Sequence, residues 1–191
     1  MEATSSSASS ADDWLRLNRA WWDERAPVHA ASGYYDVPGF LAGQDSLRAF
    51  EPGEVADVRG KRLLHLMCHI GLDTLSWARR GAIVTGLDFS RPALDTAVSV
   101  AGRAGIGSAR FVAAEIGEAS QALAGETFDV VYTGTGVTQW IPDIGAWART
   151  VAVEPPHRQR RQRAGRRRTA HRVPARIRLH RRPVPWPRTR Q

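Results

Sequence analysis

Residues 62–73 read Arg-Leu-Leu-His-Leu-Met-Cys-His-Ile-Gly-Leu-Asp, and this stretch decides the fold of the 191-residue chain. Its first half, residues 63–67, is a short and nearly continuous apolar run, which is typical of a strand buried on both faces. Over residues 71–80 the apolar side chains recur at helical spacing, and Gly81 follows where glycine commonly ends a helix. The stretch therefore predicts a strand, a turn and a helix in immediate succession.

The same alternation continues downstream. We predict strands over residues 82–87, 109–113 and 127–133, and helices over residues 91–103, 118–124 and 143–150. Ser90 is placed to cap the helix that starts at residue 91, and Pro92 suits its first turn. Apolar strands separated by helices indicate a parallel sheet covered on both faces, so we predict an α/β fold whose doubly wound, mostly parallel sheet has about four strands within residues 61–154.

The segment before the sheet has a different pattern. We expect residues 1–11 to be a disordered lead-in and residues 12–60 to form an N-terminal helix and a lid segment. The helix is expected over residues 12–25, where Trp14, Leu17, Trp21 and Trp22 recur at helical spacing, and Pro27 should stop it. Three tryptophans on one short helix favour a face docked on the core, with a role in gripping a substrate as the alternative.

Charge divides the chain near residue 154. Residues 1–154 carry 13 basic and 19 acidic side chains, a net charge of −6, whereas residues 155–191 carry 14 arginines and no acid. Such an Arg- and Pro-rich tail cannot bury enough surface to fold, so we expect disorder. The tail is either an arm that neutralises nucleic-acid phosphates or an out-of-frame reading of a GC-rich gene. Lys61 is the only lysine, which indicates a GC-rich gene and favours the second interpretation.

Other simple features limit the possible classes. The single cysteine excludes an internal disulfide framework and suits a reducing compartment. The first residues lack the basic and apolar regions of a secretory signal, and no apolar run is long enough to span a bilayer. We therefore expect a cytoplasmic protein without a membrane partner.

Ligands of an open parallel sheet bind beyond the carboxyl ends of its strands, so the residues there are the site candidates. Residues 67–71 follow the first strand, and Asp88 ends the second, where a carboxylate can accept the hydroxyls of a ribose. Glu115 and the amide of Ile116 follow the third strand and could contact an adenine edge, and Thr133 ends the fourth. Simpler alternatives are that Asp88 only caps the next helix and that Glu115 is a solvated loop acid.

Three side chains near the first loop, His65, Cys68 and His69, raise the question of a metal site. Adjacent residues on a strand point to opposite faces, so Cys68 and His69 cannot easily converge with His65 on one ion, and we expect no metal. Cys68 has no activating base in the motif and is a weak candidate nucleophile. A cofactor of the NAD type would require G-x-G-x-x-G after the first strand, which this loop lacks.

Residues 64–76, 81–90 and 128–132 together resemble class I S-adenosylmethionine-dependent methyltransferases. The His-Leu-x-Cys-His-x-Gly form of the first loop is similar to a bacterial branch of that superfamily, and residues 18–27 resemble the N-terminal lid of the same branch. The resemblance covers about residues 14–150. The chain departs from the general pattern at His65, where an acid is usual, and at Met67 and His69, which replace two of three glycines.

The resemblance implies a Rossmann-like fold, S-adenosylmethionine as cofactor, and in-line displacement at an activated methyl group, which needs no catalytic triad. The cofactor site is expected to consist of His65, Met67, Cys68, His69, Gly71, Asp73, Asp88, Phe89, Glu115, Ile116 and Thr133. For the acceptor, and for a base if one is needed, the lid offers His29, Tyr34 and Tyr35. If the tail is an out-of-frame reading, the acceptor is expected to be a small molecule, because the acidic body would repel phosphate backbones. Nucleic acid is a partner only if the basic tail is genuine.

The resemblance also implies three further strands after residue 150, which the Arg-rich tail does not encode. We therefore expect an incomplete domain that binds S-adenosylmethionine weakly or not at all. The alternative function is a nucleic-acid-binding protein that uses the arginine tail on an inactive α/β scaffold.

Overall fold

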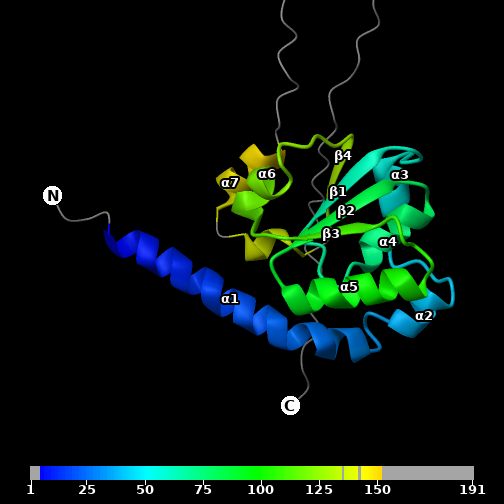
Figure 1. Cartoon of the computed structure of the whole chain (residues 1–191), viewed down its shortest axis with the longest axis horizontal. Coiled ribbons are helices and arrows are strands. Elements are labelled where there is room, and N and C mark those ends of the chain that lie inside the picture. Colours follow the sequence, from blue (N-terminus) through cyan, green and yellow to red (C-terminus); the bar gives the residue numbers. More distant parts are fainter. Residues whose placement is uncertain (1–4, 135, 142, 152–191) are drawn as a thin grey trace, which may run out of the picture.

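Four parallel strands form the centre of the protein, in a computed structural model that describes residues 5–134, 136–141 and 143–151. The strands are β1 (Arg62–Leu66), β2 (Ile83–Asp88), β3 (Arg110–Ala113) and β4 (Val130–Thr133), and their order in the sheet is β3-β2-β1-β4 (Figure 1). The chain runs outward from β1 to β3 and then returns to pair β4 with the free side of β1. This confirms the predicted doubly wound sheet and puts its change of direction between β1 and β4.

The observed strands lie within the predicted ranges or within one residue of them, but β4 is shorter. Its ladder with β1 starts at the pair Leu63 and Val130. One residue earlier, the Asp129 carboxylate accepts the backbone N–H of Arg62 at 3.0 Å. At this end of the ladder, the acceptor for the N–H of Arg62 is therefore a side chain and not a backbone carbonyl of β4. The three residues before Val130 are therefore outside the strand.

Helices cover both faces of the sheet, as expected for nearly continuous apolar strands. The helices after β1 are α4 (Leu72–Arg79), α5 (Arg91–Arg103), η1 (Ile116–Glu118), α6 (Ala119–Ala122), η2 (Thr138–Trp140) and α7 (Ile144–Val151). Leu63 of β1 packs in a cluster with Trp77 of α4, whereas its neighbour Leu64 packs in a cluster with Leu123 and with Trp147 of α7. Successive residues of β1 thus point to opposite, covered faces.

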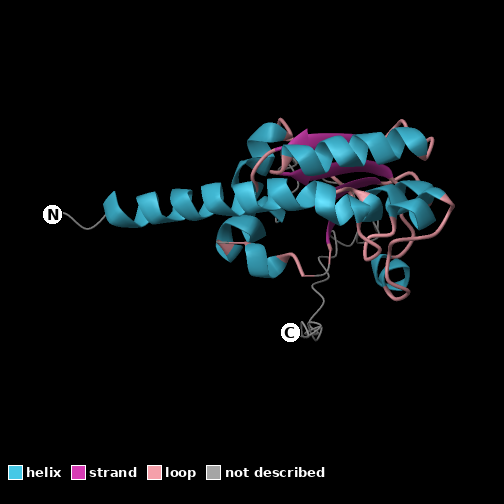
Figure 2. Ribbon diagram, turned by 90° about the horizontal axis from the view of Figure 1, so that it is seen from below, coloured by secondary structure: helices cyan, strands magenta, loops and turns pink. Residues whose placement is uncertain are grey.

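The N-terminal helix differs from the prediction. It is α1 (Ser5–Ala31), which begins inside the expected lead-in and continues through Pro27. Proline removes only one helical hydrogen bond here, and burial of the neighbouring Ala26, which is 0% exposed in a core cluster, holds the turns around it. Figures 1 and 2 show that the first turns of α1 extend beyond the rest of the described chain.

The face of α1 that packs on the body is not the expected tryptophan face. Trp14, Leu17 and Trp21 are 38%, 59% and 39% exposed, whereas Asn18 and Ala26 are buried and Trp22 is partly buried. Two short helices follow in the lid segment, α2 (Val37–Leu41) and α3 (Glu51–Val55). The prediction of a docked helix is right, but only one of its three tryptophans faces the core.

The Arg-rich tail of residues 155–191, with both interpretations of it, lies outside the described residues. In the part of the chain that the structure describes, no helix is long and apolar enough to cross a membrane.

Candidate functional site

The loop between β1 and α4 has an alternating backbone conformation. Met67, His69 and Gly71 have φ angles of 56°, 50° and 77°, so every second residue is in the left-handed region. For a residue with a Cβ this region costs about 1–2 kcal/mol. The loop therefore follows the path of a glycine-rich loop although two of its three special positions carry side chains, a form of strain that is concentrated at functional sites.

Gly71 has no room for a side chain. A Cβ there would lie 2.7 Å from the Cβ of Ala97 and 3.0 Å from a ring carbon of Phe111. Cys68 is also enclosed, since its Sγ would be 2.8 Å from a Cβ built on Gly86, and burial raises the pKa of its thiol. Gly71 sets the path of the loop, and Cys68 packs beneath it as an uncharged group.

Asp88 braces this loop from the end of β2. One carboxylate oxygen accepts the backbone N–H of His69 at 2.8 Å, and the other accepts that of Ser90 at 2.9 Å. The side chain is 7% exposed, and burial raises its pKa against the opposing effect of these backbone hydrogen bonds. A third backbone N–H, that of Phe89, also acts on the carboxylate. Three of its four lone-pair sites are then used, so the carboxylate can brace the loop and still accept one ligand hydroxyl.

Two buried polar side chains lie beneath the start of α4. His65 Nδ1 is 2.8 Å from Thr74 Oγ1, and burial lowers the pKa of this histidine to about 3, so that it is neutral at pH 7. Asp73 accepts a hydrogen bond from Ser46 Oγ at 2.7 Å, and burial raises its pKa to about 6. Both groups are held in place by short side-chain hydrogen bonds.

These groups converge with Tyr132 near the carboxyl end of β4, where Gly134 follows Thr133. Tyr132 donates its hydroxyl hydrogen to Glu51 at 2.8 Å. A Cβ built on Gly134 would lie 3.6 Å from Asp73 Oδ2, 3.6 Å from His65 Nε2 and 3.8 Å from the Tyr132 oxygen. A carboxylate oxygen, an imidazole nitrogen and a hydroxyl oxygen therefore lie near one another beside Gly134.

The lid contributes aromatic rings and a second imidazole to the β1–α4 loop. His29 Nδ1 of α1 is 2.9 Å from His69 Nε2. The Tyr35 ring lies 5.1 Å from His29 and 5.3 Å from His69, and Trp22 lies 5.2 Å from His69. Trp140 of η2 closes the group at 5.3 Å from Trp22.

Of the predicted acceptor residues, His29 and Tyr35 thus reach the loop, and Tyr34 does not. Tyr34 is 83% exposed and packs on Tyr35 at 5.2 Å. The sequence suggested a substrate-gripping role for Trp22 only as an alternative to docking on the core, and it suggested no site role for Trp140. No local signal marks Trp140, because only the fold brings η2 against α1.

Glu115 is partly buried, with 27% of its side chain exposed. It forms an ion pair at 2.6 Å with Arg19, which ties α1 to the segment after β3. Ile116 opens η1 beside it and packs against the core cluster of Leu64. Phe89 is partly buried directly after Asp88.

Two buried polar atoms on the inner face of α1 have no hydrogen-bond partner among the described residues, Asn18 Nδ2 and Asp23 Oδ1. The Asp23 charge contributes to the raised pKa of Asp88, after the larger effect of burial. Buried polar groups are nearly always satisfied, so these atoms fit a helix that covers a polar ligand. The available sequence signal was their place on the same side of α1 as Trp22.

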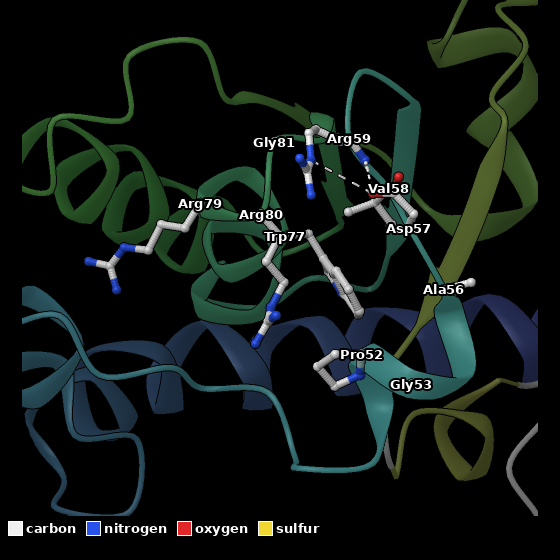
Figure 3. A pocket seen from close by; sticks show the side chains of 10 residues that line it. All are labelled: Pro52, Gly53, Ala56, Asp57, Val58, Arg59, Trp77, Arg79, Arg80 and Gly81. Carbon is white, nitrogen blue, oxygen red and sulfur yellow. Dashed lines mark hydrogen bonds and ion pairs between the residues drawn. The ribbon is translucent and has the colours of Figure 1, made fainter.

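A separate hollow of about 690 Å³ lies near the amino ends of β1 and β2, away from their carboxyl ends (Figure 3). Its cations already have partners. Arg80 pairs with Asp45, Arg59 pairs with Asp57, and Arg79 turns away from Trp77 to donate to backbone carbonyls. The hollow offers no converging polar groups comparable with those around Gly134.

His65 of β1 and His69 of the loop take different partners, Thr74 for His65 and His29 for His69. Over the described residues, no group of three or more side chains is arranged to hold a metal ion.

The described chain combines a doubly wound sheet with a strained loop after β1 and a buried acid at the end of β2. In α/β proteins this carboxyl edge is the usual place for nucleotide-type ligands. Residues 63–153 match the family model described as "Methyltransferase domain". This match supports a relationship of residues 63–153 to the class I S-adenosylmethionine-dependent methyltransferase family. No curated protein matches the chain.

Solved structures give similar but partial matches. One is described as "Conversion of a Disulfide Bond into a Thioacetal Group during Echinomycin Biosynthesis", with 27% identity over 61% of this chain and 47% of that one, at a TM-score of 0.44. An arsenic (III) S-adenosylmethionine methyltransferase from Chlamydomonas reinhardtii has 24% identity over 58% and 42%, at a TM-score of 0.44. An S-adenosylmethionine-dependent methyltransferase from Mesorhizobium loti has 22% identity over 58% and 48%, at a TM-score of 0.43. The chain covers less than half of each of these structures.

Proposed function

We propose that the protein transfers a methyl group from S-adenosylmethionine to a small-molecule acceptor. The observation that carries the proposal is the family match over residues 63–153, the part of the chain that contains the strained loop and Asp88. The net charge of −6 over residues 1–154 disfavours polyphosphate acceptors and supports a small molecule.

The described residues fit this cofactor at two places. Asp88 has one lone pair left for a ribose hydroxyl. The oxygen atoms of Asp73 and Tyr132 beside Gly134 are hydrogen-bond acceptors of the kind that the ammonium group of the methionine part needs. We propose that the full set named from the sequence lines this site, with Glu115 acting through its ion pair to Arg19.

When bound, the cofactor would supply a methyl group activated by a positively charged sulfur. The chain's own task is then to orient the acceptor and to exclude water. Trp22, Tyr35 and Trp140 supply ring surfaces at the loop, and the inner face of α1 covers it. The unpartnered atoms of Asn18 and Asp23 are available for polar groups of the ligands.

Calorimetric titration of the protein with S-adenosylmethionine and with its demethylated product tests the proposal. We expect Asp88→Asn to weaken binding by about 10–100-fold, because a hydrogen bond to a charged group contributes about 1.5–3 kcal/mol. The control is Asp95→Asn, an exposed acid on α5 that should bind as the unsubstituted protein does. Equal affinity in both variants, or no binding by the folded protein, would contradict the proposal. The affinity of the unsubstituted protein in the same titration also tests the expectation that the incomplete domain binds S-adenosylmethionine weakly or not at all.

The alternative function, nucleic-acid binding, is supported only by the 14 arginines of residues 155–191. Removing these residues separates the two functions. Retention on nucleic acid at low salt should be lost if the tail binds phosphates, whereas cofactor affinity should stay unchanged.

A further inference from the structure

The His29–His69 contact joins two segments that are 40 residues apart in the sequence. His69 keeps its side chain at a left-handed backbone position, φ 50°, where glycine would be free of strain. His29 comes from the last turns of α1, the same helix that carries Trp22. The strained loop residue is therefore placed so that its imidazole meets the lid.

Two neutral imidazoles that share a hydrogen bond carry two N–H hydrogens on their four ring nitrogens. One ring donates through the shared nitrogen and the other accepts, so the two outer nitrogens always hold one N–H and one lone pair between them. Within the described ranges, the structure shows a hydrogen bond at the shared nitrogens and none at the outer ones. Whichever tautomer is present, the pair presents one proton acceptor.

The surroundings keep the pair uncharged near neutral pH. Burial, and next the His29 ring, lower the pKa of His69 to about 4. Burial and the Arg25 charge on α1 lower the pKa of His29. The other titratable groups around the pair are Tyr35, whose pKa burial raises to about 12, and Asp88, which accepts the His69 backbone N–H.

We propose that His29 and His69 act together as the proton acceptor of the methyl transfer and that the acceptor is a flat molecule with a hydroxyl group, such as a phenol. This inference rests on the proposed function. The hydroxyl oxygen forms a bond to the methyl carbon, the carbon–sulfur bond breaks with its electron pair going to sulfur, and the hydroxyl proton passes to the imidazole lone pair. A methyl ether, the demethylated cofactor and a protonated imidazole pair result, so charge and atoms balance.

The chemistry of the pair selects this acceptor class. A hydroxyl has lone pairs for attack while it is still protonated, and it becomes strongly acidic only as the new bond forms, so a weak base suffices. An ammonium must lose its proton before it can attack, which this weak base cannot achieve. A thiolate needs no proton acceptor, and the aromatic rings of Trp22 and Tyr35 favour a flat partner.

The test compares phenol with thiophenol, two probes that differ in the attacking atom, using the full chain and labelled S-adenosylmethionine. Phenol methylation should fall about 100-fold in His29→Gln and in His69→Asn, whereas thiophenol methylation should stay within about threefold. Asparagine is chosen at residue 69 because it tolerates the left-handed conformation. The control Glu24→Gln, an exposed residue of α1, should leave both rates unchanged.

Imidazole resonances in the free protein give a second readout that needs no activity. The His69 ring should stay neutral down to about pH 4 and should titrate at higher pH in His29→Gln, because a neighbour that competes for the proton is gone. An equal fall of both methylation rates, or histidines that titrate independently near pH 6.5, would overturn the inference. Cofactor binding without phenol methylation would overturn it and leave the proposed function standing, whereas absent cofactor binding would overturn both.

Discussion

Replacing Gly71 by alanine should destabilise the protein through two separate effects. The first is conformational, because alanine at a φ of 77° costs about 1–2 kcal/mol. The second is steric, because the new Cβ would lie 2.7 Å from that of Ala97 and 3.0 Å from the Phe111 ring, and overpacking of this kind costs about 1–3 kcal/mol. The free energy of unfolding should therefore fall by about 2–5 kcal/mol.

A matched control separates the two effects. Gly105 has a φ of 70° and nothing within 4 Å of the added Cβ, so Gly105→Ala should lose only the conformational part. Urea unfolding followed by tryptophan fluorescence measures both variants, and Trp77, which is 0% exposed, reports loss of the core. Equal destabilisation of the two variants would refute the argument that the loop packs tightly between α5 and β3.

Three further predictions concern polar contacts around the site. Tyr132→Phe should lower stability by about 1–3 kcal/mol in urea unfolding, because the buried Glu51 loses its 2.8 Å hydrogen bond; an unchanged midpoint would contradict the contact. Asp73→Asn should change how stability depends on pH. The pKa of Asp73 is about 6 in the folded state and lower in the unfolded state, so between pH 4 and pH 6 only the folded state holds the proton. As the pH rises through that range, the free energy of unfolding of the unsubstituted protein should fall by about 2–3 kcal/mol relative to that of the variant. A constant difference between the two unfolding curves would refute this sign. Arg19→Gln should cost less than about 1 kcal/mol, because the ion pair with Glu115 is partly exposed, and a loss above 2 kcal/mol in the same assay would show that it is a main tie of α1.

The sheet was predictable because its signals are local. Apolar runs with helices between them set the strand order along the chain, and the helix Arg91–Arg103 was placed at both ends by its cap Ser90 and by the loss of apolar spacing. The Ser90 hydroxyl accepts the Ala93 N–H at 3.3 Å, as a capping side chain should. Such short-range chemistry is decided within one or two turns of chain.

Helix α1 could not be placed by the same reasoning. Pro27 is a strong local signal for a helix end, but burial of Ala26 against the body outweighs one missing hydrogen bond. Helical spacing also could not tell which side of α1 would dock, since tryptophans lie on more than one side of it. The body selected the side with Asn18 and Trp22.

The sequence by itself determined the α/β class, the parallel strands and the positions of Asp88 and Gly71 at the carboxyl edge, because strand and helix periods, caps and turns are properties of neighbouring residues. Only the tertiary structure decided which distant groups meet: His29 with His69, Arg19 with Glu115, and Asp73 with Tyr132 around Gly134. These contacts depend on how α1 and the lid pack on the sheet. That packing is the sum of many weak burial terms from the whole domain, and no single segment encodes it.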